Sequence, residues 1–361
     1  MITRTFAGAF VVTLAGLAAA FLYDGSAGLA LVAVLAVLEI SLSFDNAVVN
    51  AKVLDRMSPF WQKVFLTVGV AIAVFGMRLV FPLLIVGITA RLGPGRALDL
   101  ALHDHARYQH LLEDAYPMIA AFGGMFLMML FLEFVFADRE ERWLTWLERP
   151  LARLGALDRL PVVISGGALV LVASFWAADA GDVMVAGVLG MVTYVLVNGL
   201  GELFAEAEEE SEERAGAAGA VGKAAFFLFV YLEVLDASFS FDGVIGAFAI
   251  STDPIIIAIG LGIGAMYIRS LTVFLVRKGT LHEYVYLEHG AHWAIGALAV
   301  CMLVSVGHEV PEWLTGGLGA GLIIAAFAAS VVRNRREAAA SASAPADQGA
   351  GGGSRSRPMS A

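Results

Sequence analysis

The chain has 361 residues, of which 59% are hydrophobic and only 16% are charged, and its mean hydropathy is +0.79. Soluble globular domains contain roughly 45–50% apolar and about 25% charged residues, so the composition excludes an ordinary soluble protein and predicts an integral membrane protein. The formal net charge of −10 comes largely from one acidic run between Glu202 and Glu213, which argues against nucleic-acid binding.

Ten apolar runs predict ten membrane-spanning helices. A spanning helix needs about 20 apolar residues, and in lipid an open chain can satisfy its backbone polar groups only as a helix. The first run contains about 19 apolar residues, which exceeds the apolar region of a signal peptide and favours a span. The runs cover approximately residues 5–23, 27–50, 62–89, 117–137, 161–178, 183–204, 224–250, 254–277, 292–308 and 314–333.

The placement of basic residues predicts the orientation of these spans. Ten spans put both termini on one side, and 18 of the 23 lysines and arginines then fall on that side. Because basic residues are retained in the cytoplasm, we expect both termini to be cytoplasmic and the protein to lie in the plasma (inner) membrane. The exceptions are Arg91, Arg96 and Arg107 in one external loop, and Arg78 and Arg269 within spans.

One polar pattern occurs twice within the apolar runs. The first copy runs from Glu39 to Asn46 (Glu-Ile-Ser-Leu-Ser-Phe-Asp-Asn), and the second from Asp236 to Gly243 (Asp-Ala-Ser-Phe-Ser-Phe-Asp-Gly). The copies lie five spans apart and therefore cross the membrane in opposite directions. Such inverted repeats are a common plan of secondary transporters. The expected fold is an all-α polytopic membrane protein with about ten transmembrane helices in a five-plus-five inverted repeat.

This repeat also predicts the division of the chain. We expect the first membrane half at 1–204, with repeat one at about 5–178, and an unstructured acidic cytoplasmic linker at 205–223. The remainder of the second half follows at 224–333, with repeat two at about 183–333, and a disordered cytoplasmic tail at 334–361 ends the chain.

The acids of the two copies need a compensating partner. A carboxylate at bilayer depth costs about 2.5–3.5 kcal/mol, and a bound cation is the simplest partner. The candidate ligands offer only carboxylate, amide and hydroxyl oxygens, which suit Mg²⁺, Ca²⁺ or Mn²⁺ rather than Zn²⁺ or Cu⁺. They are Glu39, Ser43, Asp45 and Asn46 in the first copy and Glu233, Asp236, Ser240 and Asp242 in or beside the second.

Two of these acids do not share a helical face with the others. Glu39, Ser43, Asn46 and Asn50 form one polar stripe, whereas Asp45 lies about 240° around an ideal helix from Glu39, and Asp242 is displaced in the same way. Either the helix opens locally near Ser-Phe-Asp, which we favour, or each aspartate faces a different neighbour.

Several polar residues leave more than one interpretation open. The acids could instead be protonated, or be paired with Arg78 and Arg269, which each lie in the span after a motif. These arginines could also pair with Glu113 or Glu288, or serve as gate charges. His292 is a candidate proton carrier, because imidazole titrates near pH 6.5, or a plain interfacial histidine. The histidine-rich loop at 103–110 is either a transient metal site or a solvated amphipathic loop.

At these motifs the chain resembles the TerC family of LysE-like transporters, which is named for tellurium resistance. The resemblance rests on residues 38–48, on 240–254 with its Ala-Ile-x-x-Asp-Pro ending, and on the span around Arg269, and it covers roughly residues 27–333. It implies export of manganese from the cytoplasm. It also implies that the cation ligands include Glu39, Asp45, Asn46, Asp236 and Asp242.

The expected function is therefore divalent cation transport rather than enzymatic catalysis, with Mn²⁺ as the favoured substrate and no resident cofactor. Proton exchange is the expected coupling, because each positive charge expelled against 100 mV costs about 2.3 kcal/mol. Two rival functions are a non-transporting stress-response scaffold and an intramembrane aspartyl protease. The protease is disfavoured because the chain lacks a Gly-x-Gly-Asp motif.

Overall fold

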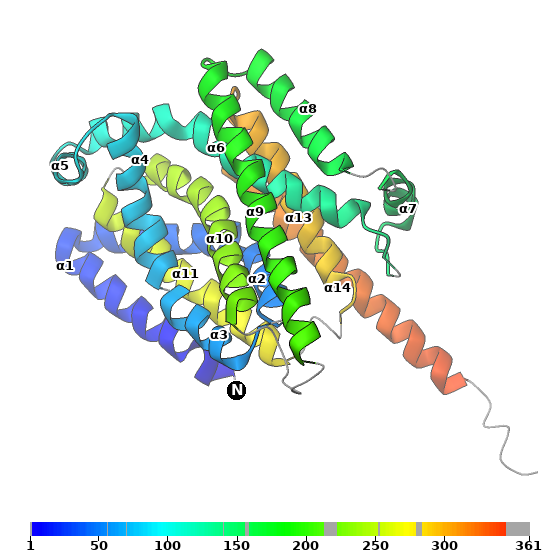
Figure 1. Cartoon of the computed structure of the whole chain (residues 1–361). Coiled ribbons are helices and arrows are strands. Elements are labelled where there is room, and N and C mark those ends of the chain that lie inside the picture. Colours follow the sequence, from blue (N-terminus) through cyan, green and yellow to red (C-terminus); the bar gives the residue numbers. More distant parts are fainter. Residues whose placement is uncertain are drawn as a thin grey trace, which may run out of the picture.

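The computed structural model describes residues 2–55, 57–69, 71–139, 141–155, 159–212, 222–251, 253–278 and 284–343, and the regular elements of these ranges are all helical (Figure 1). Two of them, η1 and η2, are π-helices. The elements are α1 (Ile2–Leu42), α2 (Phe44–Asp55), α3 (Pro59–Val64), η1 (Phe65–Gly69), η2 (Ile72–Val80), α4 (Phe81–Thr89), α5 (Pro94–His103), α6 (His105–Phe136), α7 (Thr145–Leu154), α8 (Leu160–Phe175), α9 (Ala180–Glu212), α10 (Gly222–Ile250), α11 (Pro254–Lys278), α13 (Leu287–Ser305) and α14 (Glu312–Ser343).

Within these ranges, six helices are long and apolar enough to cross a membrane, namely α1, α6, α9, α11, α13 and α14. A seventh results if the bent pair Pro59–Gly69 and Ile72–Ile88 forms one span. The expected all-helical, membrane-capable class is thus confirmed. Helix α8 is apolar but has only 16 residues, and α10, which carries the second motif, is not among the six.

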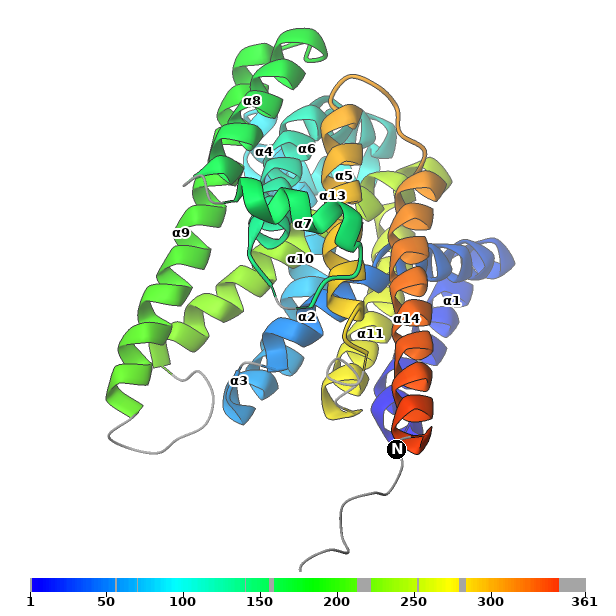
Figure 2. The ribbon, with the colours of Figure 1, turned by 90° about the vertical axis from the view of Figure 1, so that its right-hand side faces the viewer.

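The membrane-capable helices form an inner and an outer set. The apolar window of α6 is 78% buried, whereas that of α1 is only 11% buried. In Figure 2, α1 and α9 lie on opposite flanks of the molecule, with α10, α11 and α13 between them. The exposed side chains of the outer helices, such as Leu14, Leu22, Leu196 and Ile324, are apolar. An apolar outer surface suits contact with lipid.

Helix α1 has two limbs that meet at Asp24 and Gly25. Both residues leave the helical conformation, and Gly25 has φ +62°, which glycine adopts without the strain that a side chain would add. The Tyr23 hydroxyl donates to the Asp253 carboxylate at 3.0 Å. Asp253 in turn caps α11 by accepting from the backbone N–H groups of Ile255 and Ile256. The bend in α1 is thereby tied to the start of α11.

Three segments are more helical than the sequence predicted. The acidic linker expected at 205–223 begins as the last turns of α9, which ends at Glu212, because alanine and glutamate are strong helix formers. Helix α14 likewise continues into the expected tail as far as Ser343. The histidine-rich segment is not a loop, since it forms the end of α5 and the first turns of α6.

Helix α7 is amphipathic and is held against α13 by one buried carboxylate. Glu148 accepts from the backbone N–H groups of Trp143 and Leu144 and from the Trp293 indole at 3.0 Å. The Nδ1 atom of His289 lies 3.2 Å from the same carboxylate. Burial alone would raise the pKa of Glu148, but the hydrogen bonds from His289 and Trp293 hold it below its ordinary value of 4.5.

Helices α6 and α9 approach each other closely at Gly190, so we expect a side chain at this position to lower stability. A Cβ atom at Gly190 would lie 2.2 Å from the Phe122 carbonyl oxygen, whereas a Cβ atom at Gly167 on α8 would meet no atom within 4 Å. We expect Gly190→Ala to destabilise the protein by about 1–3 kcal/mol, because overpacking forces the backbones apart. Gly167→Ala is the matched control and should leave the thermal unfolding midpoint in detergent unchanged or slightly raised.

The anchor of α7 predicts a pH-dependent contribution to stability. Because the pKa of Glu148 is lowered in the folded state, its contribution is present at neutral pH and is lost as the pH falls through the lowered pKa. The difference in thermal midpoint between wild type and Glu148→Ala should therefore be constant at neutral pH and shrink below pH 4.5.

The segment just before α7 offers a control for Glu148. Glu141 forms an exposed ion pair with Arg333, and exposed pairs contribute only about 0–1 kcal/mol. Glu141→Ala should therefore leave amide hydrogen exchange in α7 slow, and Glu148→Ala should accelerate it. Equal exchange rates in the two variants would contradict the anchoring role.

Candidate cation site

The first motif copy lies where α1 gives way to α2. The helix is interrupted at Ser43 for one residue and resumes at Phe44, a shorter break than the local opening expected near Ser-Phe-Asp. The Ser43 N–H still donates to the Glu39 carbonyl at 2.9 Å, and its hydroxyl donates to the Glu39 carboxylate at 2.8 Å. Ser43 therefore both bends the chain and holds the acid.

Glu39 is almost fully buried and is paired with an arginine. Arg78, on η2, donates to the Glu39 carboxylate and to the Ala73 carbonyl. On the other side, Glu39 packs against Gly264 of α11, where a Cβ atom would lie 2.4 Å from the Glu39 side chain. The carboxylate is thus held between η2 and α11.

The second motif copy has a continuous helix but the same kind of pair. Helix α10 runs without interruption through the Ser-Phe-Asp stretch, so the predicted opening is absent from its described backbone. Asp236, which is 6% exposed, accepts from Arg269 at 3.3 Å. The Arg269 guanidinium also donates to the Gly69 carbonyl at 3.5 Å and lies 4.0 Å from the centre of the Phe65 ring.

The two pairs correspond in position along the chain. In each copy, the first acid of the motif binds the arginine of the membrane segment that follows: Glu39 binds Arg78, and Asp236 binds Arg269. The sequence left open whether Arg78 and Arg269 pair with the motif acids or with Glu113 and Glu288. In the structure they pair with the motif acids.

The two pairs also share their supporting elements. Helix α11 carries Gly264, which contacts Glu39, and Arg269, which contacts Asp236; these positions are about 7.5 Å apart along the helix axis. The segment from η1 to η2 likewise carries Gly69 and Arg78. Both motif copies therefore converge on the same two parts of the fold.

Glu233 adds a carboxylate that these pairs do not neutralise. It lies one helical turn before Asp236 and is 7% exposed, and neither of its carboxylate oxygens has a hydrogen-bond partner within the described ranges. A Cβ atom at Gly69 would lie 2.6 Å from Glu233 Oε1, so the absence of a side chain at Gly69 makes room for the acid. Together with Glu39, Asp236, Arg78 and Arg269, it makes a described cluster of three carboxyl groups and two guanidinium groups.

Amide groups from α2 are also buried in this region. Asn46 and Asn50 are 2% and 0% exposed, and neither side-chain atom of Asn50 has a partner among the described residues. An amide oxygen without a partner is a suitable ligand for a hard cation.

Three predicted ligands have side chains outside the described part of the structure: those of Asp45 in α2 and of Ser240 and Asp242 in α10. Among the residues that are described, no group of three or more His, Cys, Asp or Glu side chains is close enough to hold a metal ion. The described acids lie in the two arginine pairs and at Glu233.

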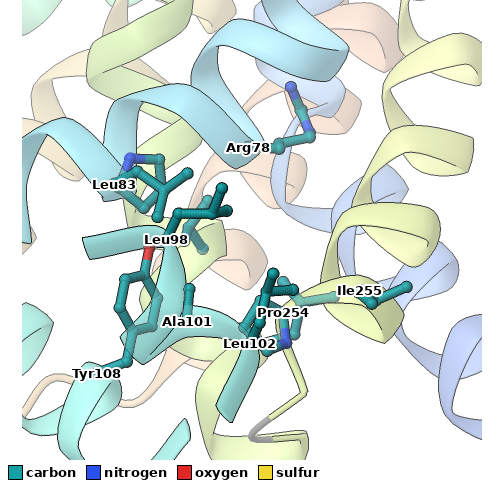
Figure 3. A pocket seen from close by; sticks show the side chains of 11 residues that line it. Arg78, Leu83, Leu98, Ala101, Leu102, Tyr108, Pro254 and Ile255 are labelled. Carbon is teal, nitrogen blue, oxygen red and sulfur yellow. The ribbon is translucent and has the colours of Figure 1, made fainter. Parts of the chain in front are cut away.

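A cavity of about 70 Å³ adjoins Arg78. It is lined mainly by apolar side chains of α4, α5, α6, α10 and α11, and in Figure 3 Arg78 lies at one end, with Tyr108 and Leu102 at the other. This volume has room for about two water molecules, at roughly 30 Å³ each. The cavity separates the Glu39–Arg78 pair from the helical segment that the charge distribution predicts to be external.

The other predicted gating residues lie apart from the two pairs. Glu113 is exposed on α6 and accepts from Gln109 at 2.7 Å. Glu288, at the start of α13, binds Lys52 at 2.9 Å and Arg139 at 3.4 Å. His292 stacks on Phe134 at 3.7 Å and hydrogen-bonds the Glu288 carbonyl through Nδ1.

Two polar contacts of the structure were not predicted from the sequence. Lys52 joins the end of α2 to α13 through Glu288, and Asp253 caps α11. The Asp-Pro pair at 253–254 is a recognisable cap signal, because proline favours the first helical turn. No local signal identifies Glu288 as the partner of Lys52, since 236 positions separate them in the sequence.

The buried pairs predict coupled effects on stability. Glu39→Gln and Arg78→Gln should each lower the free energy of unfolding by about 3–5 kcal/mol, because each leaves one buried charge without its partner. The double variant should lose less than the sum. Glu113→Gln is a control, because Glu113 is exposed. Thermal unfolding in detergent measures all four variants, and strictly additive losses would contradict the pairing.

Comparison with known proteins gives a family but no activity. The family model described as "Protein of unknown function (DUF475)" matches residues 44–337. No curated protein and no solved structure matches the chain. The family match contains the whole second motif, begins within the first, and extends over most of the chain, so the chain belongs to the DUF475 family.

Proposed function

We propose that the chain is a multi-pass membrane transporter that exports a divalent cation, Mn²⁺ being the favoured substrate, from the cytoplasm in exchange for protons. The observation that supports it is the excess carboxylate of Glu233 beside the Asp236–Arg269 pair. An ionisable side chain that is buried without a partner is expensive to charge and marks a functional site in a membrane protein. Cation binding there would restore the charge balance.

In this mechanism the cation and the arginines compete for the same carboxylates. The proposed ligands are oxygen donors of both motif copies: Glu39, Ser43, Asp45, Asn46, Glu233, Asp236, Ser240 and Asp242. Arg78 must leave Glu39 before Glu39 can bind the metal. Likewise, Arg269 must leave Asp236 before Asp236 can bind it. The arginines thus hold the acids in place and keep the interior near neutrality between transport events.

The proposed architecture is ten spans in two inverted halves, with both termini in the cytoplasm of a plasma-membrane protein. The equivalent pairs Glu39–Arg78 and Asp236–Arg269 support the repeat, because each half contributes one acid and one arginine from corresponding segments. Division of α1 into two spans, the bent segment from α3 to α4, and helices α8 and α10 would supply the four spans beyond the six long helices.

Alternating access needs a closure on each side of the site. We assign the external closure to the Glu39–Arg78 pair, because the cavity lies between it and α5. The cytoplasmic closure is the cluster of Lys52, Arg139 and Glu288, which ties α2 to α13. Exporting a divalent ion against 100 mV costs about 4.6 kcal/mol, and proton entry would supply this free energy.

A structural scaffold is the second candidate function. The observation that favours it is that Glu39 and Asp236 already have arginine partners, so these acids can hold the bundle together without a metal. A scaffold would not explain the excess carboxylate at Glu233.

Transport into inside-out vesicles tests the proposal. Purified wild-type protein should accumulate Mn²⁺ when the vesicle interior is acidic, since protons then leave as metal enters. Asp45→Ala and Asp242→Ala should each reduce uptake at least about tenfold, because each removes a proposed charged ligand, and a lost charge interaction of about 1.4 kcal/mol is already tenfold. Glu113→Gln is the matched acidic control and should transport normally.

Competition by Mg²⁺, Ca²⁺ and Zn²⁺ in the same vesicles ranks the substrates. Uptake that is equal with and without protein would support the scaffold instead. Normal uptake by both aspartate variants at equal protein levels would contradict the proposed ligands.

A further inference from the structure

Helix α7 is oriented unlike the helices around it. It follows α6 and precedes α8, and in Figure 2 it runs across α13 rather than along it. Its ten residues are too few to cross a membrane. A short helix that lies across membrane helices occupies the position of an interfacial helix.

The contacts of Glu148 fix which face of α7 points outward. Its carboxylate is bound by the Trp293 indole and lies beside the His289 ring, and Leu151 packs on the same side against the main apolar core. Rotation of α7 about its axis would break these contacts, so the opposite face is constrained to point away from the protein.

That outward face combines an aromatic residue with two cations. Trp146 is 76% exposed, and Arg149 and Arg153 are also exposed. At about 100° per residue, these three positions fall within an arc of about 60°. Leu154, at the edge of this face, is exposed as well. We call Trp146, Arg149 and Arg153 the outward stripe.

The two arginines of the outward stripe have no ion-pair partner among the described residues. Of the described acids nearest in sequence, Glu148 is buried, Glu141 binds Arg333, and Asp138 binds Arg142; Glu140 and Asp158 lie outside the described residues. Within the described ranges, the stripe therefore carries a positive charge without an acidic partner next to an exposed indole.

The chemistry of the stripe matches the surface of an anionic bilayer. Tryptophan favours the headgroup level of a membrane, and arginine binds phosphate oxygens through two parallel hydrogen bonds. Helix α8, which follows α7 along the chain, exposes Val162 and Val163, whose apolar side chains suit contact with acyl chains. Charge and position both favour a phospholipid over a soluble anion.

We propose that the outward stripe of α7 binds the headgroups of anionic phospholipids. Arg149 and Arg153 bind the phosphate, and Trp146 inserts between headgroup and acyl chains. Glu148 acts only by holding the stripe outward. This binding requires that the chain lie in a membrane, and it does not depend on whether the chain transports a cation.

Lipid titration of the full-length protein in detergent tests the proposal. Short-chain phosphatidylglycerol should raise the thermal midpoint of wild type more than phosphatidylcholine does. Each arginine near an anionic surface contributes about 1 kcal/mol, so Arg149→Gln/Arg153→Gln should bind phosphatidylglycerol about 30-fold more weakly. Arg335→Gln/Arg336→Gln removes the same charge from exposed positions on α14 and should bind as wild type does.

A second measurement locates the lipid at Trp146. Brominated phosphatidylglycerol should quench the part of the fluorescence that Trp146→Phe removes. Equal loss of lipid affinity in the two double variants would overturn the proposal, as would absence of this quenching. Stabilisation by inorganic phosphate as strong as that by phosphatidylglycerol would also overturn it, because it would indicate a site for a free anion.

Discussion

The interior of this protein depends on neutralising charge where water is scarce. Transfer of an isolated carboxylate or guanidinium into an apolar medium costs many kcal/mol, and a close partner of opposite charge recovers much of this cost. Glu39 with Arg78 and Asp236 with Arg269 meet that requirement. Because each pair joins two elements, the need for neutrality also sets which helices meet: η2 with the end of α1, and α11 with α10.

The two pairs make the halves of the chain similar but not equivalent. Helix α11 supports both, through Gly264 and Arg269, whereas the first motif bends its helix at Ser43 and the second does not. Among the described residues, Glu233 adds a buried carboxyl group without a hydrogen-bond partner beside the second pair.

Much of the fold follows from local features of the sequence. The ten apolar runs fall mainly within described helices, although those at 161–178 and 292–308 extend three residues beyond α8 and α13. Asp24-Gly25 divides α1, and the Asp253-Pro254 pair begins α11. Contacts between distant residues were less predictable. Glu148 and Trp293 lie 145 positions apart, and no local pattern pairs them. Sequence alone left several partners open for Arg78 and Arg269, since the choice depends on how the helices pack. The helical form of the segment at 94–116 was missed because its polar residues mimic a loop.

The π-helical form of η1 and η2 has a mechanical consequence. A π-turn contains about one more residue than an α-turn, so the segment that bears Gly69 and Arg78 stores surplus chain within a helix. If η2 tightened to α-helical geometry, each following residue would turn by roughly 100° about the axis. Arg78 and the residues that follow it would then turn away from Glu39, while the helix itself stayed hydrogen-bonded. A register change of this kind needs no hinge between rigid bodies, and it would connect the two arginine sites through one continuous piece of backbone.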